Sequence, residues 1–507
     1  MRIMARKDRP AVGIDYGTTS ALAAVASRGG SPVVVSVPQK PDGPVLDRLP
    51  SYLYFPRAGR AVVGEVARKL YPFKPHKVIR SVKRDLARTW TVGKTTYGAA
   101  DLVRFVLREI VAAARAHAGA TVREAVLTVP STFGQEERRI MIEAARSAGH
   151  GLDATLLDEP LAAFLAYLEE AGKGLCQPPP ARRGRVLVVD MGGGTTDISV
   201  LDVDPAGRGA CTARVRGVHS DTRLGGDDFD TAIAGHLAAA GMDESPPGSG
   251  PLTEDARRWA GGRLLVAAEE AKIALAGPAG TVHVGVTGLP GGIDLATDLD
   301  GPTLAEIVDA LVGRLREAIR HGLEISSSAA SDVDVVVLAG GMAFLGPVAE
   351  AAGEAVGRRP VRLASPMTAV VRGACLHHMG IVGDAPSVLV EPLRPVLTES
   401  LGLKLAGGGY LPLVEAGTEL PARRIATGCL LTPHTGCASI RVPLYGGDGG
   451  RASGRRLLAT LTLKGRAGIP GGQPVGLEVT ADTNKMVHVR AFLEGRSEGG
   501  SLEVLGL

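Results

Sequence analysis

Apolar residues follow two different patterns along the 507-residue chain. Up to about Gly383, short apolar runs typical of buried strands alternate with stretches of helical period, such as residues 100–117, 135–147, 253–276 and 303–321. From Leu393 to the end, strand-like runs such as SIRVPLY and VGLEVTA recur between glycine-rich turns without a helical period. The pattern predicts α/β layers in residues 1–383 and a small antiparallel β-sandwich in residues 393–507.

Residues 384–392 join the two predicted domains. This segment, DAPSVLVEP, is short and is apolar at Val388, Leu389 and Val390. Because a merely flexible linker is typically rich in glycine and serine, we expect these apolar residues to dock on a protein surface at least part of the time.

A glycine turn joins two strand-like runs near the middle of the first domain. The run VLVVD ends at Asp190 and ISVLDV begins after Asp197; between the two carboxylates stand Gly192, Gly193, Gly194, Thr195 and Thr196. Glycines leave backbone N–H groups uncovered, threonines add hydroxyl donors, and carboxylates can hold a cation, so the turn can cradle phosphate. Taken alone, such a turn is more often an ordinary hairpin loop.

A second copy of the pattern favours the phosphate site. At the N-terminus an apolar strand carries Asp15, and Gly17, Thr18, Thr19 and another apolar run follow. Two such units in one chain indicate two similar halves facing one ligand, with both turns on phosphates and both aspartates near one Mg²⁺. The order strand, turn, strand differs from that of dinucleotide-binding and Walker A motifs, in which a helix follows the loop.

Further glycine pairs and a basic stretch stand between the other predicted elements. Gly225 and Gly226 precede a helix with an acidic first turn, and Gly340 and Gly341 follow a buried strand. The acidic turn after the first pair is the charge order that a helix dipole favours, and the second pair lets a ligand lie against the backbone. By composition alone, the stretch KVIRSVKRDLART around Lys83 is a solvated basic face.

Composition describes an ordinary soluble protein. A net charge of +4 and an aromatic content of 4% give no reason to expect nucleic acid or a membrane surface as the main partner. The five cysteines are scattered without a C-x-x-C pair, which indicates neither a disulfide framework nor a zinc site. No uncharged apolar stretch of about 18 residues occurs, so we expect a cytoplasmic protein without a membrane anchor.

The motifs GIDYGTT, LLDEPLAAFLAY, VVDMGGGTTDISV, LGGDDFD and VVVLAGG occur in this order. With them the chain resembles the heat-shock protein 70 family, the DnaK-type chaperones, whose ATPase domain has an actin-like, duplicated ribonuclease H-like fold. The phrases ESLGLKL, GTELP and GLEVTADTN extend the resemblance into the β domain. The resemblance implies ATP and ADP binding with Mg²⁺, hydrolysis of ATP, unfolded or extended apolar polypeptide as a partner, and a J-domain protein and a nucleotide exchange factor as co-chaperones.

The resemblance also implies roles for individual residues. Asp15 and Asp190 would hold the Mg²⁺, and Lys83 would position the attacking water. The implied catalytic residues are Lys83, Glu159, Asp190, Asp197 and Thr195. The implied nucleotide contacts are Gly17, Thr18, Thr19, Gly192, Gly193, Gly194, Thr196, Gly225, Gly226, Glu269, Lys272, Gly340, Gly341 and Phe344. Pro130 and Arg138 match a relay between the nucleotide and the linker, although a strand-ending proline and an exposed arginine explain them equally well.

The chain departs from the family in the adenosine pocket and in the β domain. Where a serine, a stacking arginine and an aspartate are usual, it has Ala276, Phe344 and Met367. Phe344 can still stack on a purine, so phosphate binding is better supported than adenine specificity. In the β domain Lys485 replaces a usual glycine, and the chain stops at Leu507 without a helical lid, so we expect bound peptide to exchange quickly. A peptide cleft and core packing explain equally well the apolar residues Leu403, Leu405, Tyr410 and Leu411.

Three functions from different classes follow. The first is an ATP-dependent, lidless DnaK-type chaperone. The second is a nucleotide-gated interaction module for a dedicated protein partner with little or no hydrolysis, because the adenosine pocket is altered and the lid is missing. A small-molecule kinase on the same scaffold is weaker, because nothing in the β domain resembles a substrate pocket.

Overall fold

The structure, a computed structural model, describes residues 9–39, 44–57, 59–148, 151–207, 210–243, 253–278, 280–384, 394–405, 409–432, 434–435, 439–447, 456–464, 471–494 and 501–505. The chain divides into two compact units, Met1–Leu393 (unit 1) and Arg394–Leu507 (unit 2). Apart from Asp384, the predicted linker with its apolar residues lies outside the described residues.

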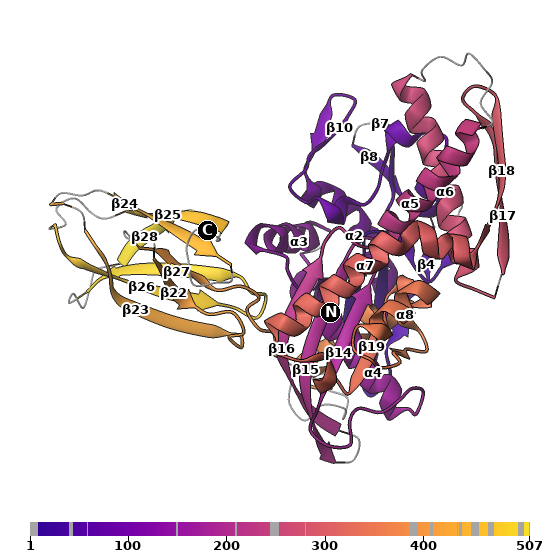
Figure 1. Ribbon diagram of the computed structural model, residues 1–507. Coiled ribbons are helices and arrows are strands. Elements are labelled where there is room, and N and C mark those ends of the chain that lie inside the picture. Colours follow the sequence, from indigo (N-terminus) through magenta and orange to yellow (C-terminus); the bar gives the residue numbers. More distant parts are fainter. Residues whose placement is uncertain are drawn as a thin grey trace. The chain divides into compact units, whose positions relative to one another are not determined.

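Two mixed sheets form the centre of unit 1. The first contains β1 (Ala11–Tyr16), β2 (Ser20–Ala26), β3 (Val33–Val34), β6 (Leu49–Pro50), β12 (Glu124–Val129) and β13 (Asp153–Asp158). The second contains β14 (Gly184–Met191), β15 (Thr196–Gly207), β16 (Ala210–Asp221), β19 (Val335–Ala339) and β20 (Val361–Arg362). Strands β14, β15, β16 and β19 of the second sheet are labelled in Figure 1.

The strands of the two sheets follow the same order. The first reads β13-β12-β1-β2-β3, with β6 also on β2, and the second reads β20-β19-β14-β15-β16. In each sheet the first two pairings are parallel and the next two are antiparallel. The central strands β1 and β14 are buried along most of their length, as their unbroken apolar runs predict. The β1–β2 and β14–β15 hairpins thus occupy equivalent positions in two sheets of the same topology.

Helices cover both sheets of unit 1, and α7 lies on β15 and β16 (Figure 1). The helices are α1 (Glu65–Leu70), α2 (Ala99–Ala118), α3 (Gln135–Ser147), α4 (Glu159–Gly172), α5 (Gly226–Asp243), α6 (Glu254–Leu275), α7 (Gly301–Ile325), α8 (Gly346–Glu354) and α9 (Ala369–Val382). The bounds predicted for α2, α3 and α6 differ from these by at most one residue at either end.

The prediction of 303–321 for α7 is too short. The carboxylate of Asp300 accepts a hydrogen bond from the Thr303 backbone N–H at 2.9 Å, so the helix begins at Gly301 with Pro302 in its first turn. Proline is tolerated there because the N–H it lacks has no partner within the helix. At the other end the buried side chain of Leu323 packs into the core and keeps the last turn helical.

The segment between β3 and α2 contains short elements that the sequence did not reveal. Strands of two to five residues are too short to display a period. They are β4 (Val37–Pro38), β5 (Val45–Leu46), β7 (Leu53–Arg57), β8 (Arg60–Val63), β9 (Val78–Ile79), β10 (Trp90–Val92) and β11 (Thr95–Tyr97), with the 3₁₀ turns η2 (Pro75–Lys77) and η3 (Val82–Arg84). The remaining elements of the unit are the hairpin β17 (Thr281–Leu289) and β18 (Ile293–Asp300), and the turns η4 (Ala330–Asp332), η5 (Gly341–Phe344) and η6 (Pro366–Thr368).

Helix α9 touches two neighbours through backbone atoms. A Cβ added to Gly373 would lie 1.7 Å from the carbonyl oxygen of Ala162 in α4, and one added to Gly13 in β1 would lie 2.3 Å from the backbone nitrogen of Cys375. Only glycine fits at these crossings, because any side chain would force the elements apart. Helix α9 is thereby held tightly between α4 and the first sheet.

Unit 2 contains strands as its regular elements over the described residues. They are β21 (Leu401–Lys404), β22 (Tyr410–Val414), β23 (Ala422–Leu431), β24 (Ser439–Gly446), β25 (Arg456–Lys464), β26 (Pro474–Ala481), β27 (Val487–Leu493) and β28 (Ser501–Leu505). Their order is β22-β21-β24-β25-β28-β27-β26-β23, and every pairing between them is antiparallel. The predicted antiparallel β architecture is thus confirmed over these residues.

The apolar residues proposed for a peptide cleft fall in different environments. Leu403 belongs to the core of unit 2, so core packing is its role, whereas Leu405 is 43% exposed. Leu411 packs against that core, and the Tyr410 hydroxyl donates to the carbonyl of Ser400 at 3.1 Å. Lys485 adopts a φ of 62°, a conformation that normally favours glycine, which explains why glycine is the usual residue there.

Candidate functional site

The turns that follow β1 and β14 meet at a pocket of about 470 Å³ in unit 1. Most of the residues predicted to act on a nucleotide line this pocket: Asp15, Gly17, Thr18, Thr19, Lys83, Glu159, Asp190, Gly192, Gly193, Gly194, Thr195, Gly226, Glu269, Lys272, Gly340, Gly341 and Phe344. The fold therefore brings glycine turns, carboxylates and a lysine together from both halves of the unit.

Thr196, Asp197 and Gly225 do not line the pocket and instead support it from behind. Thr196 is fully buried, and its hydroxyl donates to a backbone carbonyl at 2.8 Å. Asp197, also fully buried, is paired with Asp190 in the register of β14 and β15. Gly225 touches the turn itself, since a Cβ there would lie 2.6 Å from the backbone nitrogen of Gly194.

Asp15 and Asp190 are held at strand ends by their neighbours. Each is the next-to-last residue of its strand, beside Thr128 and Ala339 respectively in the parallel neighbour. The Thr128 hydroxyl donates to Asp15 Oδ1 at 3.0 Å. Desolvation raises the pKa of Asp15, and desolvation together with Asp197 and Asp15 raises the pKa of Asp190 to about 8.

Lys83 is buried, contrary to the interpretation of its stretch as a solvated basic face. Its side chain stands in η3 with only 4% of the residue exposed, and its ammonium donates to Glu159, the first residue of α4. Burial would lower the pKa of Lys83, but the charges of Glu159 and Asp15 outweigh it and raise that pKa. The amine is therefore protonated at neutral pH.

Acidic groups outnumber basic ones around this lysine. Desolvation raises the pKa of each of its four acidic neighbours, Asp15, Glu159, Asp190 and Asp197. Carboxylate oxygens are ligands that Mg²⁺ prefers, and a cation would favour the charged form that burial disfavours, so the residues present fit a divalent cation at Asp15 and Asp190. No cluster of three or more His, Cys, Asp or Glu side chains forms a metal site within the described residues. A cation here would complete its shell with water and phosphate oxygens.

Two glycines of the β14 turn, Gly193 and Gly194, are required by close packing between the two halves. A Cβ on Gly193 would lie 1.8 Å from Thr19 Oγ1, and one on Gly194 would lie 2.4 Å from Thr18 Oγ1. The first turn of α5 is bonded to the same loop, because the Asp227 backbone N–H donates to the carbonyl of Gly193 at 2.7 Å. The two turns and the N-terminus of α5 thus form one packed group.

The pocket lining also includes apolar residues. Ala276 lies there with three large exposed side chains, Ile273 at 62%, Met367 at 44% and Phe344 at 36%. The guanidinium of Arg362 lies 5.5 Å from the centre of the Phe344 ring. The three departures from the family's adenosine pocket therefore all line this pocket, and Phe344 offers an aromatic surface to a base.

Glu269 and Lys272 project from α6 into the pocket. The Lys272 ammonium lies 2.7 Å from Asp230 and donates to the carbonyl of Gly226 at 3.1 Å. Glu269 lies 4.0 Å from Arg68. Both side chains are thus oriented by charged or polar neighbours before any ligand binds.

Sequence reasoning missed Asp47, Arg48, Asp227 and Asp230, all of which line the pocket. The two last belong to the LGGDDFD motif, where their acidic character already marks the start of a helix. Asp47 and Arg48 lie between short strands and carry no comparable signal.

The segment after β12 links Asp197 to the start of α4. The Ser131 backbone N–H donates to Asp197 Oδ1 at 3.0 Å, and Arg138 pairs with Asp158 at 3.0 Å. Arg138 is 1% exposed, so the alternative of an exposed arginine is wrong.

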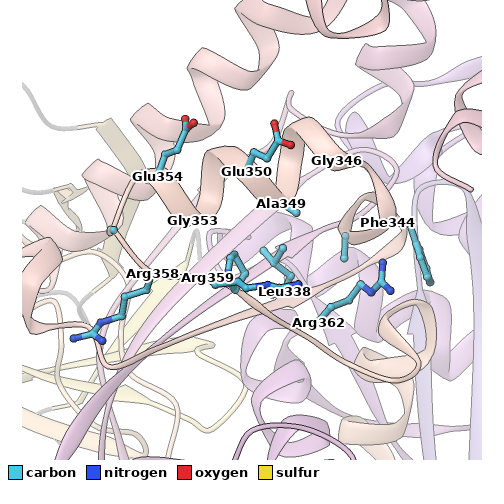
Figure 2. A pocket seen from close by; sticks show the side chains of 13 residues that line it. Leu338, Phe344, Gly346, Ala349, Glu350, Gly353, Glu354, Arg358, Arg359 and Arg362 are labelled. Atoms are coloured by element: carbon cyan, nitrogen blue, oxygen red, sulfur yellow. The ribbon is translucent and has the colours of Figure 1, made fainter. Parts of the chain in front are cut away.

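A second pocket, of about 820 Å³, lies along α8 and β20 and shares Phe344 with the first. Figure 2 shows the charged side chains around it, Glu350, Glu354, Arg358, Arg359 and Arg362. Glu354 is paired with Arg316 at 2.8 Å. Of the predicted site residues only Phe344 reaches this pocket.

Over the described part of the chain, no helix is both long and apolar enough to cross a membrane. A family model described as Hsp70 protein matches residues 86–504. The match includes the β14 turn, Glu159 and most of unit 2. The β1 hairpin and Lys83 precede it, and their place in the same pocket is known from the structure alone.

Proposed function

The chain belongs to the Hsp70 family, whose members are in general ATP-dependent chaperones, and from this premise we propose that it is a DnaK-type chaperone that hydrolyses ATP to regulate its hold on apolar polypeptide. One observation carries the proposal: Asp15, Asp190 and Lys83 line one pocket with both glycine turns. Phosphoryl transfer needs chiefly positioning and electrostatic stabilisation, and this pocket offers both.

The two turns bind the phosphates of ATP. Backbone N–H groups of the glycines and the hydroxyls of Thr18, Thr19 and Thr195 donate to phosphate oxygens. Asp15 and Asp190 hold Mg²⁺ directly or through water. When bound, the cation neutralises charge on the phosphates.

Lys83 orients the attacking water. Its protonated ammonium also offsets negative charge on the terminal phosphate, and the bond to Glu159 fixes its direction. Asp197 lies behind Asp190 and accepts hydrogen bonds from Ser131 and Ser220. These residues position the attacking water and stabilise the negative charge on the terminal phosphate, so no covalent intermediate with the protein is needed.

The segment from Pro130 to Arg138 couples the nucleotide pocket to the linker. It contacts Asp197 through Ser131 and the start of α4 through Asp158. Unit 2 binds extended apolar segments, and a J-domain protein and a nucleotide exchange factor act as co-chaperones in the cytoplasm. These parts of the proposal rest on the family alone.

Steady-state phosphate release tests the proposed ATPase activity. The affinity of the protein for a fluorescent apolar peptide tests the proposed chaperone activity. Lys83→Ala and Asp190→Asn should each lower phosphate release at least about a hundredfold. The control Lys94→Ala alters an exposed lysine in a turn and should leave the rate unchanged. Full turnover in both site variants would exclude the assignment.

The protein should bind the apolar peptide more weakly when it holds ATP than when it holds ADP. Equal affinities with ATP, ADP and no nucleotide would remove the chaperone half of the proposal and leave an ATPase. The comparison uses the full chain, because the two units have to act together.

The apolar residues of the pocket lining favour one alternative, a nucleotide-gated interaction module that barely hydrolyses ATP. Ile273, Phe344 and Met367 lack the polar groups that select and orient a nucleoside. Tight nucleotide binding with single-turnover hydrolysis no faster than in buffer would establish this alternative over the chaperone.

A further inference from the structure

Two ion pairs join the turn that carries Lys83 to the first turn of α5. Arg80 pairs with Asp227 at 2.8 Å, and Arg84 pairs with Asp228 at 2.9 Å. Lys83 lies between the two arginines in sequence. Because Asp227 itself lines the nucleotide pocket, the pairs connect the turn that carries the lysine to a second element of the pocket lining, the first turn of α5.

Arg80 is confined on several sides. Its guanidinium lies 5.7 Å from the ring centre of Tyr52 and 5.4 Å from that of Tyr71, and its side chain is 19% exposed. Stacking on aromatic faces and a largely desolvated carboxylate partner both restrict an arginine. The guanidinium therefore acts as a fixed contact and not as a mobile surface charge.

Ser81, the next residue, is held in a strained conformation. Its φ of 54° lies in the left-handed region, which is uncommon for residues other than glycine. Its hydroxyl donates to Asp227 Oδ2 at 2.6 Å. Strained residues persist where their surroundings hold them, and Asp227 accepts from both Arg80 and Ser81 to do so.

Asp227 is bonded on its other side to the phosphate-binding turn. Its backbone N–H donates to the carbonyl of Gly193 at 2.7 Å. The same residue thus connects Gly193 through its backbone and the Lys83 turn through its carboxylate.

We propose that Arg80 is a positioning residue for ATP hydrolysis: through Asp227 it fixes Lys83 relative to the turn that holds the phosphates. The inference rests on the proposed role of Lys83 in hydrolysis. Arg80 does not line the pocket, so it acts on the reaction through the lysine and not on the nucleotide.

Single-turnover hydrolysis and ATP affinity, measured separately, test this role. Arg80→Ala should slow the chemical step by between about tenfold and about a hundredfold, the size of effect that an ångström-scale misplacement produces, with ATP affinity within about twofold of wild type. Arg80→Lys should recover part of the rate, because it restores the charge but not the planar stacking. An unchanged rate, or a loss of affinity alone, would overturn the inference.

Arg88→Ala is the matched control. Arg88 belongs to the same basic stretch, and its guanidinium lies 5.5 Å from the ring centre of Trp90. This substitution should leave the rate as in wild type. If Arg80→Ala fails to fold, Ser81→Ala removes the other side-chain contact to Asp227, and it should slow the chemical step in the same direction.

Labelling of Lys83 by an amine-reactive acylating reagent separates this inference from the proposed function. Lys83 is buried in the wild type, so Arg80→Ala should increase its labelling rate by at least about fivefold through local opening. Equal labelling in both proteins would overturn the inference whatever the hydrolysis rate. Failure of the wild type to hydrolyse ATP would instead refute the ATPase proposal, while the labelling comparison would still decide whether Arg80 holds Lys83 in place.

Discussion

Asp15 and Asp190 occupy the same position in two sheets of identical strand order. Each is next to last in a central strand that pairs in parallel on one side and antiparallel on the other. The turns that follow them contact one another through Thr18, Thr19 and the glycines of the β14 turn. One cation can therefore be shared by equivalent carboxylates from the two halves.

Neutralising either aspartate should abolish the effect of Mg²⁺ on nucleotide binding. In Asp15→Asn and in Asp190→Asn, we expect ATP affinity with Mg²⁺ to fall at least about tenfold, to the level measured without it, because carboxylate oxygens are the ligands that the cation prefers. Calorimetric titration with and without Mg²⁺ measures this. Asp204→Asn, at an exposed position of β15, should behave as wild type. Undiminished Mg²⁺ enhancement in either site variant contradicts the assignment.

Gly373→Ala should destabilise unit 1 by about 2–3 kcal/mol or more, because the new methyl group has to push α9 away from the Ala162 carbonyl. Gly313→Ala is the control. A Cβ there meets nothing within 4 Å, and replacing a helical glycine should stabilise α7 by about 0.5–1 kcal/mol. Urea denaturation measures both changes. Equal stability of the two variants would show that α4 and α9 are not in backbone contact.

Phe344→Ala should weaken ATP binding by about 1 kcal/mol, roughly fivefold, through the loss of stacking on the base. Affinity for tripolyphosphate, which has no base, should stay the same. Phe73→Ala serves as the control because Phe73 is 61% exposed and does not line the pocket. Equal losses for ATP and tripolyphosphate would mean that Phe344 acts on the pocket as a whole.

The stability of the ligand-free protein should fall as Asp230 ionises. Burial raises the pKa of this carboxyl to about 6, and Lys272 only partly opposes the shift. A group whose pKa is higher in the folded chain than in the unfolded chain contributes stability that is complete below the unfolded value of 3.8 and is lost as the pH rises through about 6.

Asp230→Asn should lack this dependence. Relative to the variant, the wild type should lose about 3 kcal/mol of unfolding free energy between pH of about 4 and about 6.5. Urea denaturation across this range measures the difference. A difference that does not change with pH would show that the carboxyl titrates normally.

Prediction from the sequence succeeded where the signal is local. The paired hairpins are visible because glycines and threonines directly follow an apolar strand and an aspartate, and the helical period of α2 and α6 extends over many turns. Both hairpin aspartates could therefore be assigned to one site before the fold was known.

The rest depends on contacts between distant segments. The stretch around Lys83 is basic by composition. The Lys83 side chain is nevertheless buried, with its ammonium paired with Glu159, 76 residues further along the chain. The resemblance to a family identified this lysine, whereas its composition pointed to solvent. Asp47 and Arg48 stand among strands that are too short to show a period, and no local pattern marks them.

The contact between Gly373 and Ala162 limits how unit 1 can move. Two helices whose backbones touch cannot slide along each other without a steric clash, so the shear type of motion is blocked at α4 and α9. Any relative motion of α4 and α9 is then restricted to rotation about this crossing.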